Sequence, residues 1–280
     1  MESIKNYFEN VPGWQRSLIL AGGMMLFYFL EYIIPYITFS YKKLRHAGIN
    51  IFFTATTAIV NFALAFLIVR ACDFVVDKKF GLLYTINLPL WAFILIGLLL
   101  LDLVGAWLIH YLQHKIKWMW KFHVIHHADT YVDVTTANRH HPGESVFRFA
   151  FTVLAVLITG VPIWLVMIYQ SISALLSQFN HANITLPKKL DQVLSWVIVS
   201  PNMHKVHHHY IQPYTDSNYA NIFSIWDRMF GTFRTLNKDQ LVYGIDTHMN
   251  PNEHSNVKNL LSIPFQQYRA PGSSRVSKEQ

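Results

Sequence analysis

Twelve of the fifteen histidines in this chain fall within one hundred residues, between His110 and His209. They include three short clusters, HYLQH from residue 110, HVIHH from residue 123 and HKVHH from residue 204, and a single histidine in FNHANI between the last two. Spacings of three and four residues place side chains on one face of a helix, so each cluster presents two or three imidazoles in one direction. The chain must therefore fold so that these helix faces meet.

Histidine is the commonest metal ligand among side chains. The three clusters and the single histidine together offer nine imidazoles. A single tetrahedral or octahedral ion cannot bind all nine, so the pattern predicts two metal ions. The candidate ligands are His110, His114, His123, His126, His127, His181, His204, His207 and His208. His46, in the basic loop YKKLRHAGIN, and the isolated His248 and His254 are not expected to belong to this site.

The composition indicates a membrane protein. Apolar residues make up 52% of the chain and charged residues only 14%, about half the charged share of a soluble domain. The apolar segments 17–39, 51–69 and 88–109 are each long enough to cross about 30 Å of hydrocarbon. The single cysteine, Cys72, excludes a disulfide framework, a cysteine zinc site and an iron–sulfur cluster within the chain.

The fourth apolar segment, 146–180, is too long for one crossing, and Gly160-Val161-Pro162 interrupts it in the middle. We expect a helical hairpin, because only a hairpin returns His181 to the side of the membrane that carries His110. The predicted fold is an all-α membrane protein with four to five transmembrane or hairpin helices and a helical cap that carries the histidine clusters.

Loop charges predict the orientation of this fold. The net charge of +7 comes mostly from short loops beside the apolar segments, which favours positive-inside topology over nucleic-acid binding. The loop 40–50 and the segment 110–148 are both positive, so the histidine cap is expected on the cytoplasmic side.

Two carboxylates occur inside the apolar segments. Glu31 is a functional candidate, because charged groups within a membrane span are costly, although Pro35 and nearby tyrosines favour a place near the interface. Asp102 lies eight residues before His110, a little over two helical turns, and could orient a ligand imidazole. Packing between helices is the alternative role for Asp102.

The three clusters fit the histidine boxes H-x3-H, H-x2-H-H and H-x2-H-H. Three further stretches accompany them, TTANRHHPGE, FNHANITLP and DSNYANIFSIWDRMFGTF. Together they make residues 100–235 resemble the fatty acid hydroxylase superfamily, the sterol desaturase family of histidine-box membrane enzymes. The chain departs from the family pattern at Tyr111, often arginine, and at Ala220, usually glycine.

The resemblance implies that the nine histidines named above hold two iron ions, with O2 as co-substrate. It places His141 beside the centre as a supporting residue rather than a ligand, and leaves His140 and His209 as extra histidines. Neutral imidazole also binds zinc well, so zinc is a possible substitute in purified protein. Nothing in the sequence reads as a flavin or haem module, so the electrons are expected from a separate reductase with a ferredoxin or cytochrome.

The implied activity is hydroxylation of a C–H bond in a lipid of the fatty acyl, sphingoid, sterol or ether-lipid type. A desaturase on the same scaffold is the alternative, and a metal transporter is a third reading, which would place histidines deep inside the spans. The expected organisation is a membrane-spanning region over 1–99, a catalytic domain over 100–235 and a polar tail over 236–280.

Overall fold

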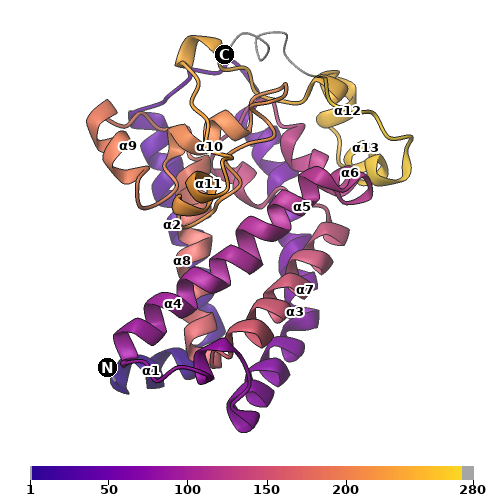
Figure 1. Cartoon of the computed structure of the whole chain (residues 1–280). Helices are drawn as coiled ribbons and strands as arrows, with labels where there is room; N and C mark the ends of the chain where they lie inside the picture. Colours follow the sequence, from indigo (N-terminus) through magenta and orange to yellow (C-terminus); the bar gives the residue numbers. More distant parts are fainter. Residues whose placement is uncertain (1, 273–280) are drawn as a thin grey trace.

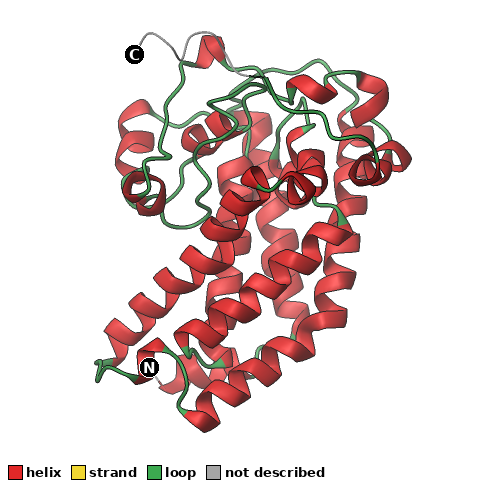
Figure 2. Ribbon diagram, turned by 45° about the vertical axis from the view of Figure 1, so that its right-hand side comes forward, coloured by secondary structure: helices red, strands yellow, loops and turns green. Residues whose placement is uncertain are grey.

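The computed structural model describes residues 2–272, and this part of the chain contains helices, turns and isolated bridges but no strand (Figure 2). The all-α prediction is confirmed. The molecule has two levels, a bundle of long helices and a cap of short helices and loops above it (Figure 1).

The bundle contains the long helices of the chain. They are α2 (Gly13–Ile33), α3 (Lys43–Lys78), α4 (Leu90–Asp102), α7 (Pro142–Thr159) and α8 (Ile163–His181), with the short α1 (Glu2–Glu9) at the end opposite the cap (Figure 1). The α4 helix runs through a π-helical turn, Leu103–Leu108, into α5 (Ile109–Lys115), which enters the cap. Buried side chains such as Leu101, Val156 and Leu165 fill the space between these helices.

The cap is built from short helices joined by loops. They are α6 (Lys117–His127), α9 (Lys188–Leu194), α10 (Pro201–His207), α11 (Ile225–Met229), α12 (Pro251–His254) and α13 (Val257–Ser262). Short 3-10 turns cover Leu82–Tyr84 below the bundle and Val134–Asn138, Lys238–Gln240, Asp246–His248 and Ile263–Phe265 in the cap.

The segment expected as a polar tail is partly a packed element of the cap. Ile245, Leu260 and Ile263 are buried against Val124 and Ile125 of α6. The last eight residues, 273–280, lie outside the described residues.

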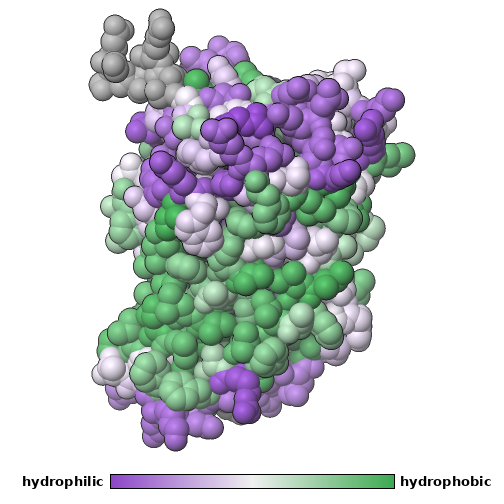
Figure 3. All heavy atoms as spheres, turned by 90° about the vertical axis from the view of Figure 1, so that its right-hand side faces the viewer, coloured by the Kyte–Doolittle hydropathy of each residue, from purple (hydrophilic) through white to green (hydrophobic). Residues whose placement is uncertain are grey.

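An apolar belt surrounds the bundle. In the described part of the chain, four helical segments are long and apolar enough to cross a membrane: Gly13–Ile33, Lys43–Tyr84, Leu90–Lys115 and Pro142–Thr159. Only 18% to 44% of these apolar windows is buried, so most of their side chains face outward. Figure 3 shows this belt between a polar cap and a smaller polar region at the other end. The chain is a membrane protein.

The hairpin prediction is confirmed by α7 and α8. Gly160 ends α7 in the left-handed conformation with φ of +81°, and Pro162 precedes α8. A Cβ atom at Gly160 would lie 2.5 Å from the carbonyl oxygen of Phe80, so this close turn requires glycine. The returning α8 brings His181 back to the cap.

The helix that carries the predicted span 51–69 is longer than that span. This helix, α3, begins at Lys43 and continues to Lys78, so most of the segment 40–50, expected as a loop, is helical. Long side chains such as lysine extend toward water from the ends of a membrane helix, so charged residues there do not end the helix.

Candidate metal centre

The nine candidate histidines meet in the cap as two adjacent groups. Ligand nitrogens within each group lie within 4.8 Å of one another. The first group contains His110, His114, His123, His127 and His207, and the second contains His126, His181, His204 and His208. The clusters lie on helices as predicted, on α5, on α6 and on α10 with the residue after it, while His181 is the last residue of α8.

Imidazole nitrogens approach one another closely in both groups. The Nε2 atoms of His110 and His123 are 3.0 Å apart, and His181 Nε2 lies 3.1 Å from the Nε2 atoms of both His126 and His204. Nitrogens bound at about 2.0–2.1 Å to one ion stand roughly 3.0–3.4 Å apart when they are neighbours in its coordination shell. The spacing therefore fits ligands that share an ion.

Backbone carbonyls fix the orientation of several rings. The Nδ1 atoms of His110, His181 and His207 donate to the carbonyl oxygens of Tyr219, Ser177 and Ser217 at 2.7, 2.7 and 2.6 Å. A donor bond at Nδ1 leaves Nε2 unprotonated and available to a metal, and such bonds are typical around metal-binding histidines. Three ligand rings are therefore held in the tautomer that coordination requires.

Several of these nitrogens have no protein partner. His114 Nε2, His127 Nε2 and His207 Nε2 in the first group, and both ring nitrogens of His208 in the second, make no hydrogen bond within residues 2–272. A buried polar atom without a partner costs about 1–3 kcal/mol. Coordination of a metal would remove this cost, so the donor set fits the two ions that the family resemblance implies.

Burial favours the metal-binding form of the rings. Desolvation and neighbouring imidazoles hold the pKa values of His126, His127, His204 and His208 well below the usual histidine range. Neutral imidazole is the form that binds metals.

Glu144 is the important residue that the sequence reasoning did not select. Its Oε1 accepts hydrogen bonds from His123 Nδ1 and Gln113 Nε2, both at 2.9 Å, and lies 3.0 Å from His140 Nδ1. His123 therefore faces Glu144 with one nitrogen and His110 with the other. The sequence motif that could have identified Glu144 is TTANRHHPGE, which ends at this glutamate.

Of the two roles considered for Asp102, packing is the one that its hydrogen bonds favour. Its carboxylate accepts hydrogen bonds from the backbone N–H groups of Ile222 and Phe223 and from Trp226 Nε1 at 3.3, 3.0 and 3.1 Å. None of these partners is a histidine. Asp102 therefore positions the 222–226 segment, which follows the carbonyl that holds His110.

Within residues 2–272, His141 also makes no hydrogen bond to a candidate ligand ring. It is the N-cap of α7, where its Nδ1 accepts the Gly143 N–H at 2.9 Å. As the N-cap, His141 fixes the start of the helix that carries Glu144. It therefore stays a candidate supporting residue that acts through Glu144.

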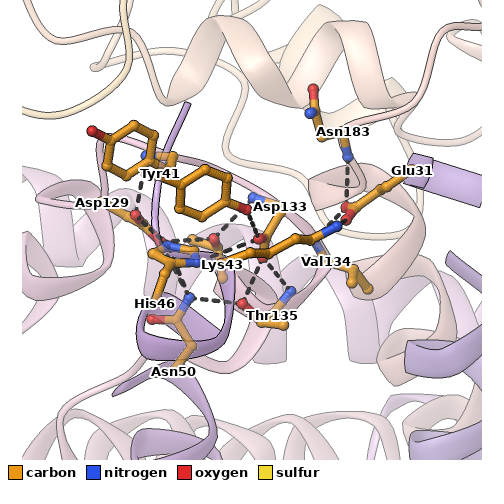
Figure 4. Close-up of polar contacts among 12 residues, drawn as sticks. Glu31, Tyr41, Lys43, His46, Asn50, Asp129, Asp133, Val134, Thr135 and Asn183 are labelled. Atoms are coloured by element: carbon orange, nitrogen blue, oxygen red, sulfur yellow. Dashed lines mark hydrogen bonds and ion pairs between the residues drawn. The ribbon is translucent and has the colours of Figure 1, made fainter. Parts of the chain in front are cut away.

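His46 is not a loop histidine, contrary to expectation. It lies in the first turn of α3, is buried, and its Nε2 contacts the two carboxylate oxygens of Asp129 at 2.8 and 2.9 Å (Figure 4). Asn50, one turn further along α3, donates to Thr135 at 2.8 Å. These contacts fasten α3 to the loop that directly follows the ligands of α6.

Glu31 has a similar connecting position. Its Oε1 accepts the backbone N–H groups of Val134 and Asn183 at 2.7 and 2.9 Å, and Lys43 lies 3.9 Å from its Oε2 (Figure 4). Asn183 comes two residues after His181. Glu31 therefore links α2 to the segments that follow the candidate ligands His127 and His181.

A small space of about 20 Å³ borders both histidine groups. His110, His126 and His204 line it from the metal side, and Ala106, Ala137 and Ser177 line it from the π-helical turn, the 3-10 turn and α8. The volume holds about one water-sized molecule. A diatomic gas is of comparable size.

The fold and the site define a class of protein: an integral-membrane protein whose cap holds a histidine-rich centre able to bind two metal ions. Comparison with known proteins gives the family. Residues 94–232 match the profile of the fatty acid hydroxylase family, and the chain belongs to the fatty acid hydroxylase superfamily, as its histidine boxes predicted.

Several characterised proteins resemble this part of the chain. An ornithine lipid hydroxylase of Rhizobium tropici is 25% identical over 52% of the chain and 43% of its own length. An alkylglycerol monooxygenase of Danio rerio is 32% identical over 52% of the chain and 31% of its own length. A cholesterol 25-hydroxylase-like protein of Danio rerio is 28% identical over 44% of the chain and 48% of its own length.

The chain thus spans less than half the length of each of these relatives. No solved structure matches it significantly.

Proposed function

We propose that the chain is an integral-membrane, O2-dependent di-iron oxidoreductase that hydroxylates a C–H bond of a lipid. One observation carries the proposal: nine buried or nearly buried imidazoles form two adjacent groups of five and four ligand nitrogens. Relatives named as lipid hydroxylases and monooxygenases support the reaction class. The lipid class in view is fatty acyl, sphingoid, sterol or ether-linked.

Two ferrous ions held there would supply the chemistry that splits O2 and attacks an unactivated C–H bond. The chain's own groups hold the ligands in place. Tyr219, Ser217 and Ser177 fix three rings through their carbonyls, and Glu144 fixes a fourth. Burial of the rings limits access of water to the centre.

Hydroxylation consumes two electrons from outside, and we assign them to a separate reductase with a ferredoxin or cytochrome. We place the cap on the cytoplasmic side, because Lys42, Lys43 and Arg45 adjoin the end of α3 that lies in the cap. A donor protein would then reach the histidine centre through the cap and not across the bilayer.

Comparison of lipids from cells with and without the active chain tests the proposal. A product heavier by one oxygen, formed only with O2 and an iron-loaded chain, is the expected result. Loss of two hydrogens would instead indicate a desaturase. Metal uptake across vesicles without any change in lipid mass would indicate a transporter and would defeat the proposal.

A further inference from the structure

A second cavity, of about 430 Å³, lies in the cap away from the space between the histidine groups. Its volume is within the range of about 300–1,000 Å³ that is typical of ligand pockets. Its walls come from the start of α3, from the loop after α6 and from the segment around α12. Nothing in the proposed hydroxylation uses this cavity.

The floor of the cavity consists of polar groups that are already paired. Asp129 accepts hydrogen bonds from His46 and from Thr136 Oγ1, the latter at 2.8 Å. Arg139 donates to Ile125 O, Asn50 Oδ1 and His254 O at 3.0, 2.9 and 2.8 Å and lies 3.7 Å from Asp129. Asp129 and Arg139 therefore offset each other's charge and are already hydrogen-bonded within the chain.

The free charge of the cavity is at Lys42 and Arg45. Both side chains are exposed, both line the cavity, and neither forms an ion pair with any residue that the structure describes. Their neighbour Lys43 differs, because it faces Glu31 (Figure 4). Two cations without an ionic partner, next to the paired Asp129 and Arg139, favour an anionic ligand.

The remaining lining is apolar and aromatic. Ile49 and Met249 line the cavity, and so do the rings of Tyr41 and Tyr131, which stack with centroids 4.6 Å apart. Tyr41 is fixed by its hydroxyl, which donates to Asp133 at 2.8 Å (Figure 4). A free inorganic anion gains no apolar contact from these walls. The glycerol and upper acyl carbons of a lipid would pack against them.

The position of the cavity relative to the bilayer also favours a lipid. Exposed apolar side chains recur along α3 from Ile51 to Val76, and Leu44 is a separate exposed apolar residue nearer the start of the helix. The stretch from Ile51 to Val76 is roughly 37 Å of helix, which is long enough to cross a hydrocarbon core of about 30 Å. Arg45 and Lys42 lie six and nine residues before Ile51 along the chain. That places them in the layer of lipid headgroups.

We propose that this cavity binds the phosphate-bearing headgroup of an anionic membrane lipid, with Lys42 and Arg45 on the phosphate. The occupant would join α3, the loop after α6 and the α12 segment. This site is separate from the histidine centre, so the inference does not depend on the reaction assigned to that centre.

Native mass spectrometry of the full chain in a neutral detergent tests the inference. The probes are phosphatidylglycerol and phosphatidylcholine with identical acyl chains. We expect retention of phosphatidylglycerol in preference to phosphatidylcholine, and a loss of roughly tenfold or more in that preference for Lys42→Gln/Arg45→Gln. The matched control, Lys188→Gln/Lys189→Gln, removes the same charge from exposed positions on α9 in the same cap and should keep the preference.

Three outcomes would overturn the inference: no preference in the unmodified chain, an equal loss in both double variants, or displacement of phosphatidylglycerol by millimolar inorganic phosphate. The last result would indicate a free-phosphate site. Thermal unfolding of each variant without added lipid checks that both remain folded. An increase in unfolding temperature on adding phosphatidylglycerol, absent from Lys42→Gln/Arg45→Gln only, would support the inference independently.

Discussion

His123 donates its Nδ1–H to Glu144 Oε1 across 2.9 Å while its Nε2 lies 3.0 Å from His110 Nε2. His123 lies on α6 and Glu144 lies on α7, and both are buried. A carboxylate behind a ligand ring fixes the tautomer and raises the basicity of the nitrogen that faces the metal. Glu144 therefore connects the membrane hairpin to the histidine centre.

Replacing this carboxylate gives the first prediction. Glu144→Ala should lower metal affinity or lipid turnover by about 10–100-fold, the usual effect of losing such a partner, without removing a ligand. Glu253→Ala is the control, because Glu253 pairs with Arg269 at the surface, 3.1 Å away. Metal content and turnover at the unmodified level in Glu144→Ala would contradict the assigned role.

Neighbouring histidines give the second prediction. His207 belongs to the first group, while His209 belongs to neither and its Nδ1 accepts the Val242 N–H at 3.2 Å. His207→Ala should lose metal and reduce turnover by orders of magnitude, whereas His209→Ala should keep the metal. Elemental analysis and lipid turnover are measured for both variants. Loss of metal and turnover in His209→Ala but not in His207→Ala would exclude the proposed ligand set.

The third prediction concerns the number of ions. Two groups of nitrogens imply two ions per chain, so elemental analysis of purified, iron-loaded chain should approach two. Zinc also binds imidazole sites well and can take the place of iron in purified protein, so iron and zinc are counted together. A reproducible total near one, with both groups intact, would rule out the binuclear centre.

Local spacing was enough to predict the clusters but not their supporting contacts. Spacings of three and four residues correctly predicted helices at His110–His114 and His123–His127, because those periods are properties of the helix itself. The π-helical turn before His110 leaves no such periodic signal. Turns of this kind are often found at functional sites, and this one sets the direction from which α5 approaches the centre.

The error at His46 and the undecided role of Asp102 have a common physical cause. His46 pairs with Asp129, 83 residues away, and Asp102 binds groups about 120 residues away. Sequence reasoning assigned each residue from its immediate neighbours, a basic loop for His46 and the helix leading to His110 for Asp102. Buried polar residues are placed by partners that only the tertiary fold provides.

The hydrogen bonds of Asp102 give the fourth prediction. Asp102→Ala leaves up to three buried donors without an acceptor, at about 1–3 kcal/mol each, so the unfolding temperature should fall clearly. Asp102→Asn keeps one oxygen acceptor and should fall less. If Asp102→Ala lost metal but unfolded at the unmodified temperature, Asp102 would act on a ligand after all.

The fifth prediction concerns the side of the membrane on which each end of the bundle lies. Single cysteines at Lys117 on α6, Lys189 on α9 and Lys78 at the far end of α3, all exposed, are introduced after Cys72→Ala. Because the α7–α8 hairpin returns the chain to the cap, cysteines at 117 and 189 should react with an impermeant reagent from the same side, and the cysteine at 78 from the opposite side. Loop charges predict that the first pair is labelled from the cytoplasmic side. Labelling of 117 and 189 from opposite sides would require one crossing over 146–180, and His181 could then no longer share an ion with His126.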